Sequence, residues 1–232
     1  MKSIRCIAYL MAAFSIRMSH AASQADVIID SFLTAQTASI VIGDRNTADG
    51  PGIIGGERDF VTFVLMSANG IVPGQLHIAS TGGGGGDIFY DGDDNDPSFS
   101  SFGGMGSIDL TQGGANDRFR FDFMSASSVP ATLTIDVKNF GIGTALQVNL
   151  PQSPGILDVL FSSFPSPPVF STVGYINLHF EIHGTGSFTI DSIITTVPEP
   201  SVHLLIVAAA FALRFVRTRL NCPSPFDRPF GA

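Results

Sequence analysis

The acidic segment Asp91-Gly-Asp-Asp-Asn-Asp-Pro97 holds the densest group of side chains that could do chemistry. Asp91, Asp93 and Asn95 alternate as the first ligands of a calcium loop do, and this hard cation takes oxygen ligands. Asp96 stands where an EF-hand loop needs a glycine for its turn, so the segment is not an EF-hand. Two interpretations follow, a calcium site at these three residues and a solvated acidic loop, and the pattern favours the loop.

A second candidate is the segment His179-Phe-Glu-Ile-His183, with two histidines four residues apart. Zinc proteases carry such a pair on a helix, with the glutamate directly after the first histidine. Here the glutamate is displaced and the segment alternates as a strand, which places the two histidines about 13 Å apart at about 3.3 Å per residue. One zinc ion cannot bridge that distance, so we predict solvated strand residues.

No arrangement of residues predicts catalysis. The nucleophile elbow Gly-x-Ser-x-Gly does not occur, and the two cysteines, Cys6 and Cys222, lie near the ends of the chain. The glycine run Gly82–Gly86 lacks the Gly-Lys-Ser/Thr ending of a phosphate-binding loop. The acidic residues show no pair of the kind that a glycosidase places across a cleft. We predict a protein that is not an enzyme, with no catalytic residues and no cofactor apart from the calcium considered above.

The elements that hold these residues are predicted to be strands, because apolar residues recur with a period of two. Arg118–Phe123, Thr132–Val137 and Ile176–Ile182 each place their apolar side chains on one face, as half-buried strands do. Further strands are expected at Val27–Leu33, Ala38–Ile42, Phe60–Met66, Gln75–Ala79, Ile88–Tyr90, Ile156–Phe161 and Phe188–Ile194. Clusters of Gly, Pro, Asn and Asp predict turns at 49–52, 68–71, 82–86, 113–116, 165–168 and 184–186. The pattern indicates an all-β fold, an antiparallel jelly-roll-like β-sandwich flanked by a signal-peptide helix and a C-terminal apolar helix.

The segment between residues 22 and 201 is strongly acidic. It contains 19 Asp and Glu against 5 Lys and Arg, so its charge is 5 − 19 = −14, whereas the whole chain carries −8. Such a surface repels nucleic-acid phosphates and anionic headgroups, so no nucleic-acid partner is expected. It suits neutral sugars or divalent cations. The group Glu57-Arg58-Asp59 is interpreted as a set of surface charges.

The first residues have the layout of a secretory signal peptide. Lys2 and Arg5 precede the apolar stretch Cys6–Ile16, and Ser19-His20-Ala21 forms a small-x-small cleavage site. We predict export by the cell's export machinery and cleavage after Ala21. The ectodomain, residues 22–196, then has no cysteine, so its stability has to come from burial rather than disulfides.

The other end of the chain combines a proline motif, an apolar run and a basic cluster. Val197-Pro-Glu-Pro-Ser201 precedes the apolar stretch Val202–Leu213, which is followed by Arg214, Arg217 and Arg219. Prolines end a preceding strand or helix, and arginines beyond an apolar stretch stop it at the cytoplasmic face of a membrane. This order favours a sorting signal over a plain membrane anchor or a core helix. The residues of the sorting motif are Val197, Pro198, Glu199 and Pro200.

Through this motif, apolar run and basic cluster, residues 197–219 resemble the PEP-CTERM domain, the C-terminal sorting signal of secreted proteins in Gram-negative bacteria. The resemblance implies that a membrane-embedded cysteine protease of the exosortase type processes the protein near Pro198-Glu-Pro200. It also implies transient anchoring in the inner membrane and then a place at the cell surface or in the extracellular matrix of bacteria that make exopolysaccharide. Residues 220–232 form a Pro-rich tail beyond this pattern.

A second resemblance covers Phe170–Ile194. The alternating strand Ile176–Ile182, a glycine turn and the strand Phe188-Thr-Ile-Asp-Ser-Ile193 are similar to the closing hairpin of jelly-roll carbohydrate-binding modules. Such modules usually stack Trp or Tyr on sugar rings. This chain has no Trp, and beyond the signal peptide its tyrosines are Tyr90 and Tyr175.

Together these features predict an exported protein of the cell envelope or extracellular matrix with a non-catalytic, structural role at the surface. The first alternative is a polysaccharide-binding module assisted by calcium at Asp91–Asp96. The second alternative is a hydrolase that acts on matrix polymer.

Changing Pro198, Glu199 and Pro200 to alanine tests the sorting signal. We expect the unaltered protein to leave the inner membrane shortened at both ends, and the variant to stay there with its tail because the protease has lost its motif. Intact mass and cell fractionation from the native host measure both outcomes. If both versions keep the C-terminus and remain membrane-bound, the segment is only an anchor.

Overall fold

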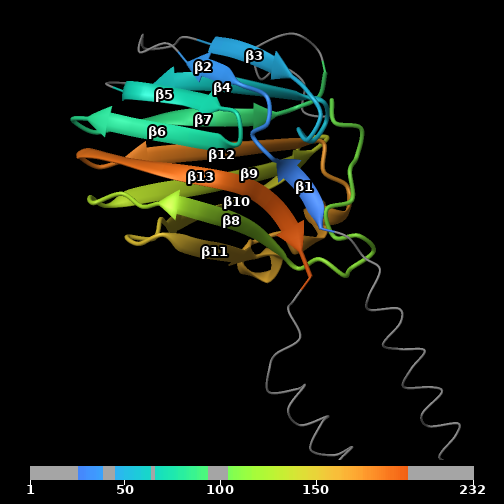
Figure 1. Ribbon diagram of the computed structural model, residues 1–232. Coiled ribbons are helices and arrows are strands. Elements are labelled where there is room, and N and C mark those ends of the chain that lie inside the picture. Colours follow the sequence, from blue (N-terminus) through green and yellow to red (C-terminus); the bar gives the residue numbers. More distant parts are fainter. Residues whose placement is uncertain (1–25, 39–44, 64–65, 94–103, 198–232) are drawn as a thin grey trace, which may run out of the picture. The chain divides into compact units, whose positions relative to one another are not determined.

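The computed structural model describes residues 26–38, 45–63, 66–93 and 104–197, and these residues form strands with two short 3₁₀ helices (Figure 1). The strands are β1 (Val27–Asp30), β2 (Gln36–Ala38), β3 (Arg45–Asp49), β4 (Glu57–Phe63), β5 (Met66–Val72), β6 (Gln75–Thr81), β7 (Gly84–Tyr90), β8 (Arg118–Ser125), β9 (Ala131–Asn139), β10 (Ile142–Asn149), β11 (Gly155–Leu160), β12 (Tyr175–Ile182) and β13 (Thr185–Thr196). The 3₁₀ helices are η1 (Phe161–Ser163) and η2 (Pro167–Ser171).

The strands form two antiparallel sheets that pack as a β-sandwich. The seven-stranded sheet has the order β11-β8-β13-β6-β5-β2, with β1 also paired to β13. The six-stranded sheet has the order β10-β9-β12-β7-β4-β3. Consecutive strands often lie in different sheets, as β6 and β7 do, so the chain crosses repeatedly between the two layers. The predicted all-β, antiparallel sandwich is confirmed.

Alternation along the strands builds the core, because successive side chains of a strand point to opposite faces. In β9, Leu133, Ile135 and Val137 are fully buried while the residues between them are half-buried. Phe180 of β12 meets Phe188 of β13 across the sandwich, with ring centroids 5.4 Å apart. Each fully buried side chain of this size contributes about 1.5–3 kcal/mol, so burial of the two apolar faces supplies the main stabilisation.

Phenylalanine rings close one end of the core. Phe161 of η1 stacks on Phe170 of η2 with centroids 4.2 Å apart, and Phe119 of β8 meets both rings edge-on. Phe164, between the two 3₁₀ helices, packs edge-on against Phe170 at 4.9 Å. Aromatic pairs in these geometries add about 0.5–1.5 kcal/mol beyond burial. The loop 161–171 is therefore part of the core.

Two predicted turns are strands in the structure. Residues 68–71 lie within β5, and Gly84, Gly85 and Gly86 open β7. At Gly85 a Cβ atom would collide with the carbonyl oxygen of Phe180 on β12. The glycines therefore allow a close approach of strands. Of the predicted turn 82–86, only Gly82 and Gly83 lie between strands.

Besides β5, the strands β3 and β10 were not expected. Neither alternates clearly between apolar and polar residues, because both lie at edges of the six-stranded sheet with one side open. Most of the expected strand 38–42, and the terminal helices expected at either end, lie outside the described residues. Within the described part, no helix is long and apolar enough to cross a membrane. The chain divides into two units, Met1–Val197 and Pro198–Ala232, and the second lies wholly outside the described residues.

The prediction that Glu57, Arg58 and Asp59 are surface charges was wrong, because all three are completely buried. Arg58 lies between the sheets. Its Nη1 atom lies 2.6 Å from Oδ2 of Asp30, which is also completely buried. Nε of Arg58 donates to Oε1 of Gln36 at 2.8 Å, and Nη2 donates to the carbonyl oxygen of Thr34 at 2.8 Å. The pair therefore joins β4 to the segment that connects β1 and β2.

Two further groups hold the Asp30 carboxylate. Oδ1 accepts from the backbone N–H of Phe32 at 2.7 Å, and Oδ2 accepts from the Tyr90 hydroxyl at 3.0 Å. Burial raises the pKa of Asp30, and the Arg58 charge opposes that rise. Burial also raises the pKa of Tyr90, so its phenol stays protonated and keeps donating to Asp30. Tyr90 is thus a structural residue with no access to a ligand.

Replacement of Arg58 by methionine tests the buried pair. We expect a loss of about 3–5 kcal/mol in unfolding free energy, because the variant leaves the Asp30 carboxylate buried without its cation. Urea unfolding followed by circular dichroism measures this loss.

Two variants serve as controls for that measurement. The double variant Asp30→Leu/Arg58→Met should recover most of the loss, since it removes both charges. Arg118→Met on the surface should cost at most about 1 kcal/mol. A loss below about 1 kcal/mol for Arg58→Met would contradict the role assigned to the pair.

Candidate functional site: the outer face of the six-stranded sheet

The outer face of the six-stranded sheet is the side turned away from the core. The strand register places its side chains in rows across β10, β9, β12, β7 and β4. Asn177 of β12, for example, lies between Asp136 of β9 and Phe89 of β7, and His179 lies between Thr134 and Asp87. The outer face thus carries polar rows in register, which the backbone ladder holds in place.

A small apolar patch lies within this polar face. Val61, Phe89 and Tyr175 are buried and form a cluster separate from the main core. The rings of Phe89 and Tyr175 have centroids 6.0 Å apart. Burial raises the pKa of Tyr175, with nearby carboxylates adding to the rise. The phenol therefore stays protonated.

Lys138 covers the edge of this patch. Its Nζ lies 5.4 Å from the centre of the Tyr175 ring and 2.6 Å from Oδ2 of Asp136. Gly143 lies opposite Lys138 on β10, and a Cβ atom there would come within 2.7 Å of the lysine Cγ. The glycine therefore leaves the space in which the lysine side chain lies. The cation–π contact and the ion pair hold a partly exposed ammonium and carboxylate side by side.

His179 and Asp87 form the second charged pair of the face. Nδ1 of His179 lies 2.7 Å from Oδ1 of Asp87. The hydrogen bond to Asp87 raises the pKa of His179, burial opposes the rise, and the charges of Asp87 and Glu181 support it. His183, by contrast, lies 3.6 Å from Glu181 and is nearly half exposed. His179 is therefore a strand residue as predicted, although it is bound to Asp87, whereas His183 lies just beyond the end of β12, in the turn before β13.

On the β9 and β12 part of this face, two buried oxygen atoms have no hydrogen-bond partner among the described residues. They are Oδ1 of Asn177 and Oγ1 of Thr132. Leaving a buried polar atom unpaired costs about 1–3 kcal/mol, and such atoms in native proteins often mark the place of a water or a ligand. Both oxygens can accept a hydroxyl proton.

Phe140 lies in the turn between β9 and β10, two residues beyond Lys138, and its side chain is 75% exposed. Its φ of 42° and the φ of 86° at Gly141 place both turn residues in the left-handed region. Such a conformation is unfavourable for a bulky residue, and strained backbone concentrates at functional positions. Phe140 and Gly141 form the two-residue turn that joins β9 to β10, and the left-handed conformation of both residues is the one such turns need.

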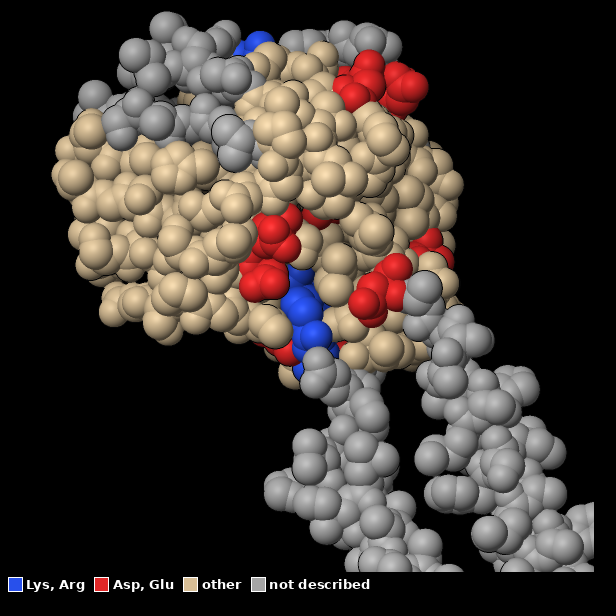
Figure 2. Space-filling model, in the orientation of Figure 1, with Lys and Arg blue, Asp and Glu red and all other residues tan. Residues whose placement is uncertain are grey.

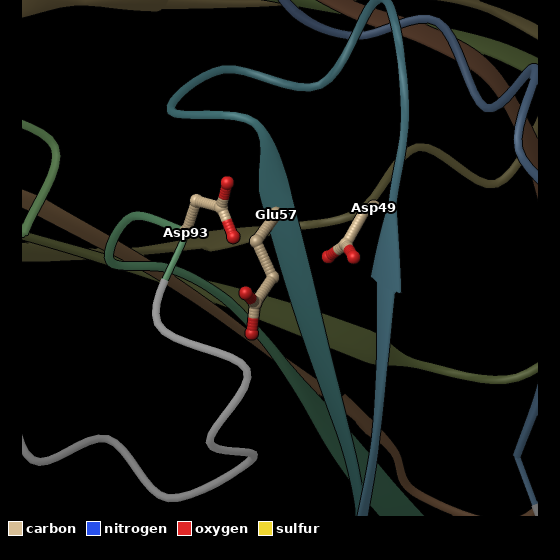
Figure 3. Close-up of side chains that lie close together, drawn as sticks. All are labelled: Asp49, Glu57 and Asp93. Carbon is tan, nitrogen blue, oxygen red and sulfur yellow. The ribbon is translucent and has the colours of Figure 1, made fainter.

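Carboxylates gather at the far end of the same sheet. Oxygen atoms of Asp49, Glu57 and Asp93 all lie within 4.8 Å of one another. Figure 3 shows that Asp49 and Glu57 come from the neighbouring strands β3 and β4, and Asp93 from the chain that follows β7. Oxygen ligands of this kind suit a hard cation such as calcium.

The predicted calcium ligands are separated in this arrangement. Asp93 belongs to the carboxylate group, Asp91 does not and is buried, and Asn95 lies outside the described residues. Asp49 and Glu57 were missed because they lie far from Asp93 in the sequence and meet it only through strand pairing. Three carboxylates alone do not define a metal site, so calcium binding stays a prediction.

The predicted terminal sites fall almost entirely outside the described residues. These are Ala21, Pro198, Glu199, Pro200, Arg214, Arg217 and Arg219. Val197 is described, and it follows directly on Thr196, the last residue of β13. The last strand thus ends just before the first proline of the motif, as the missing N–H of proline requires.

On the seven-stranded sheet, basic and acidic side chains are paired with each other. Asp158 of β11 accepts from Arg118 at 3.2 Å and from Arg120 at 2.9 Å, both on β8. In the view of Figure 2, the central column of basic side chains is flanked by acidic ones. These arginines are paired with acidic neighbours, so this surface offers no basic patch for nucleic acid.

No protein-family model and no curated protein matches the sequence. Several solved structures are similar to the chain. The family 11 carbohydrate-binding module of a cellulosomal cellulase of Clostridium thermocellum aligns with 78% of this chain and 99% of its own, at 14% identity and a TM-score of 0.40.

Two other solved structures align over less of the chain. A structure named PfGH50B aligns with 61% of this chain and 22% of its own, at 8% identity and a TM-score of 0.42. The module TmCBM61, in complex with β-1,4-galactotriose, aligns with 53% of this chain and 70% of its own, at 9% identity and a TM-score of 0.29. The strand pairing of this chain itself defines its class. The protein is an antiparallel two-sheet β-sandwich.

The His179–Asp87 pair predicts a pH dependence. Because the folded-state pKa of His179 is raised, its stabilising contribution is fully present below the unfolded-state pKa of about 6.5 and is lost as pH rises through the folded-state value. An NMR titration of the imidazole should therefore give a pKa above 6.5. Asp87→Asn should lower it clearly and Glu181→Gln only slightly, since the hydrogen bond to Asp87 is the largest cause. An unchanged pKa in Asp87→Asn would show that the pair does not form.

Proposed function

We propose that this protein is a non-catalytic polysaccharide-binding module and that it binds through the outer face of the six-stranded sheet. The observation that carries the proposal is the set of partly exposed polar groups in register across β9 and β12. They include a carboxylate, an ammonium, an imidazole and an amide at Asp136, Lys138, His179 and Asn177. Sugar hydroxyls both donate and accept hydrogen bonds, and this set offers both kinds of partner.

The chemistry of the face favours a neutral glycan. Two pairs of charged groups lie on β9, β12 and β7 in this face, Lys138 with Asp136 and His179 with Asp87. A neutral ligand can hydrogen-bond to such pairs without breaking them, and charge-assisted hydrogen bonds are the stronger ones. The strongly acidic ectodomain would repel an anionic polymer. Phe140 at the end of the face offers an exposed ring for the apolar side of a sugar.

The same pairing argues against a hydrolase. A glycosidase uses one carboxyl group as acid and a second as base or nucleophile on opposite sides of the scissile bond. On this face Asp87 is engaged by His179, and Asp136 by Lys138, at 2.7 and 2.6 Å. Each carboxylate thus already has a basic partner at hydrogen-bonding distance, so neither can act as the acid of such a pair without leaving that partner.

Export and sorting belong to the proposal as its cellular setting. They are supported by the signal-peptide layout of residues 1–21 and by the PEP-CTERM resemblance of residues 197–219. A sandwich delivered to the cell surface or the matrix would meet extracellular polysaccharide there. In this setting the structural role at the surface and glycan binding are compatible.

Affinity electrophoresis in gels with and without dissolved polysaccharide tests glycan binding, with neutral β-glucan and β-1,4-galactan as probes. We expect retardation of the full chain by a neutral polymer, with a Kd in the micromolar to millimolar range. Asn177→Ala and Asp136→Ala should each weaken binding about tenfold, the equivalent of one hydrogen bond to a charged or buried group.

Asp158→Ala, on the opposite sheet, is the matched control and should bind as the unaltered protein does. Circular dichroism should show all the variants folded. Equal loss in Asp158→Ala, or no retardation by any neutral polymer, would overturn the proposed site.

A further inference from the structure

The four outer edges of the two sheets differ in how they are protected against pairing with another strand. β2 has only three residues, and β3 begins and ends with the charged residues Arg45 and Asp49. β11 carries Asp158, bound to two arginines. Short length and charge are the usual devices that protect an edge. β10 has eight residues, Ile142–Asn149, with no charge and no proline.

The free backbone groups of β10 follow from its pairing with β9. The two-residue turn Phe140-Gly141 makes Asn139 and Ile142 a hydrogen-bonded pair. Hydrogen-bonded and non-hydrogen-bonded pairs then alternate along the ladder. In the non-hydrogen-bonded pairs, the N–H and C=O groups of four β10 residues point away from β9. These residues are Gly143, Ala145, Gln147 and Asn149. Among the described residues, none hydrogen-bonds to these outward groups.

The position of these four residues allows β10 to pair with itself. Two copies of β10 can form an antiparallel pair about a two-fold axis. The residues whose N–H and C=O groups point away from β9 must then face the same kind of residue in the second copy. When the two-fold axis passes through Leu146, Gly143 lies opposite Asn149 and Ala145 lies opposite Gln147. This is the register in which all four of these residues are paired. Every outward N–H and C=O group of β10 then has a partner.

The side chains are complementary in this register. On the core side, Leu146 faces Leu146 of the second copy, Thr144 faces Val148, and Ile142 faces Leu150. Ile142 is 70% exposed in the single chain, whereas Leu146 and Val148 already pack against the core. On the outer side the facing residues are small or neutral. The net charge of −8 per chain opposes association, but β10 adds no charge of its own to the contact.

We propose that β10 is a dimerisation edge to which a second copy of this chain adds its own β10, in an isologous two-fold contact. The two six-stranded sheets become one continuous sheet. The proposal does not depend on glycan binding. If the outer face binds a glycan, pairing sets two such faces side by side, and a long polymer can engage both at once, which raises the avidity.

Sedimentation equilibrium of the full chain tests the contact, because it reports mass without any glycan. We expect a dimer whose dissociation becomes visible on dilution. Ala145→Lys/Gln147→Lys places like charges directly opposite each other across the axis and should give a monomer at concentrations where the unaltered protein is dimeric. Ile156→Lys, on β11, adds a lysine at another exposed edge and should stay dimeric. A monomeric unaltered protein, or equal masses for both lysine variants, would overturn the proposal.

Cross-linking tests the register. In a Cys6→Ser/Cys222→Ser background, a mixture of Ala145→Cys and Gln147→Cys chains should form disulfide-linked dimers on mild oxidation. Ala145→Cys chains alone should form far fewer, because the two copies of residue 145 are not opposite each other. Cross-linking of Ala145→Cys alone at the same rate would reject the centre at Leu146. Asn177→Ala, which removes a glycan-binding residue, should leave the mass and the cross-linking unchanged.

Discussion

Burial of two apolar sheet faces against each other is the interaction on which the rest of this molecule depends. Residues 22–196 contain no cysteine, so no disulfide can replace that burial. Phenylalanine supplies much of the core, and the loop that carries η1 and η2 adds Phe161 and Phe170 to it. Successive side chains of a strand point to opposite faces of the sheet, so when one residue enters the core, the next must point away from it. The polar face of the six-stranded sheet follows from the same requirement as the core.

The buried pair of Arg58 and Asp30 is the exception inside this apolar interior. Desolvation of two charges is costly, and a pair that recovers this cost needs additional hydrogen bonds. Gln36, Thr34, Phe32 and Tyr90 provide them. The network joins β4, β7 and the chain between β1 and β2. It therefore fixes one end of the sandwich by directional bonds, whereas hydrophobic contact fixes the other.

The two proposals use different parts of the same sheet. The outer face of β9 and β12 supplies paired charges, hydroxyls and amides for a neutral glycan, and the free edge of β10 supplies unpaired backbone groups for a second chain. A rigid antiparallel ladder holds both in a fixed relation. If both proposals hold, several weak glycan sites joined by self-association would give firm attachment to a polymer without tight binding at any one site.

Much of this structure is determined by the sequence alone. The period of two in segments such as Thr132–Val137 specifies a strand with one buried face, and Pro198 specifies where the last strand stops, because both are local consequences of side-chain direction and of the missing proline N–H. Only the tertiary structure decided which strands are neighbours. Pairing of β3 with β4 brings Asp49 to Glu57, crossing between sheets buries Arg58 against Asp30, and the place of β10 at an edge leaves its backbone free. These contacts join residues distant in sequence, and strand periodicity gives the face of each side chain but not its partner.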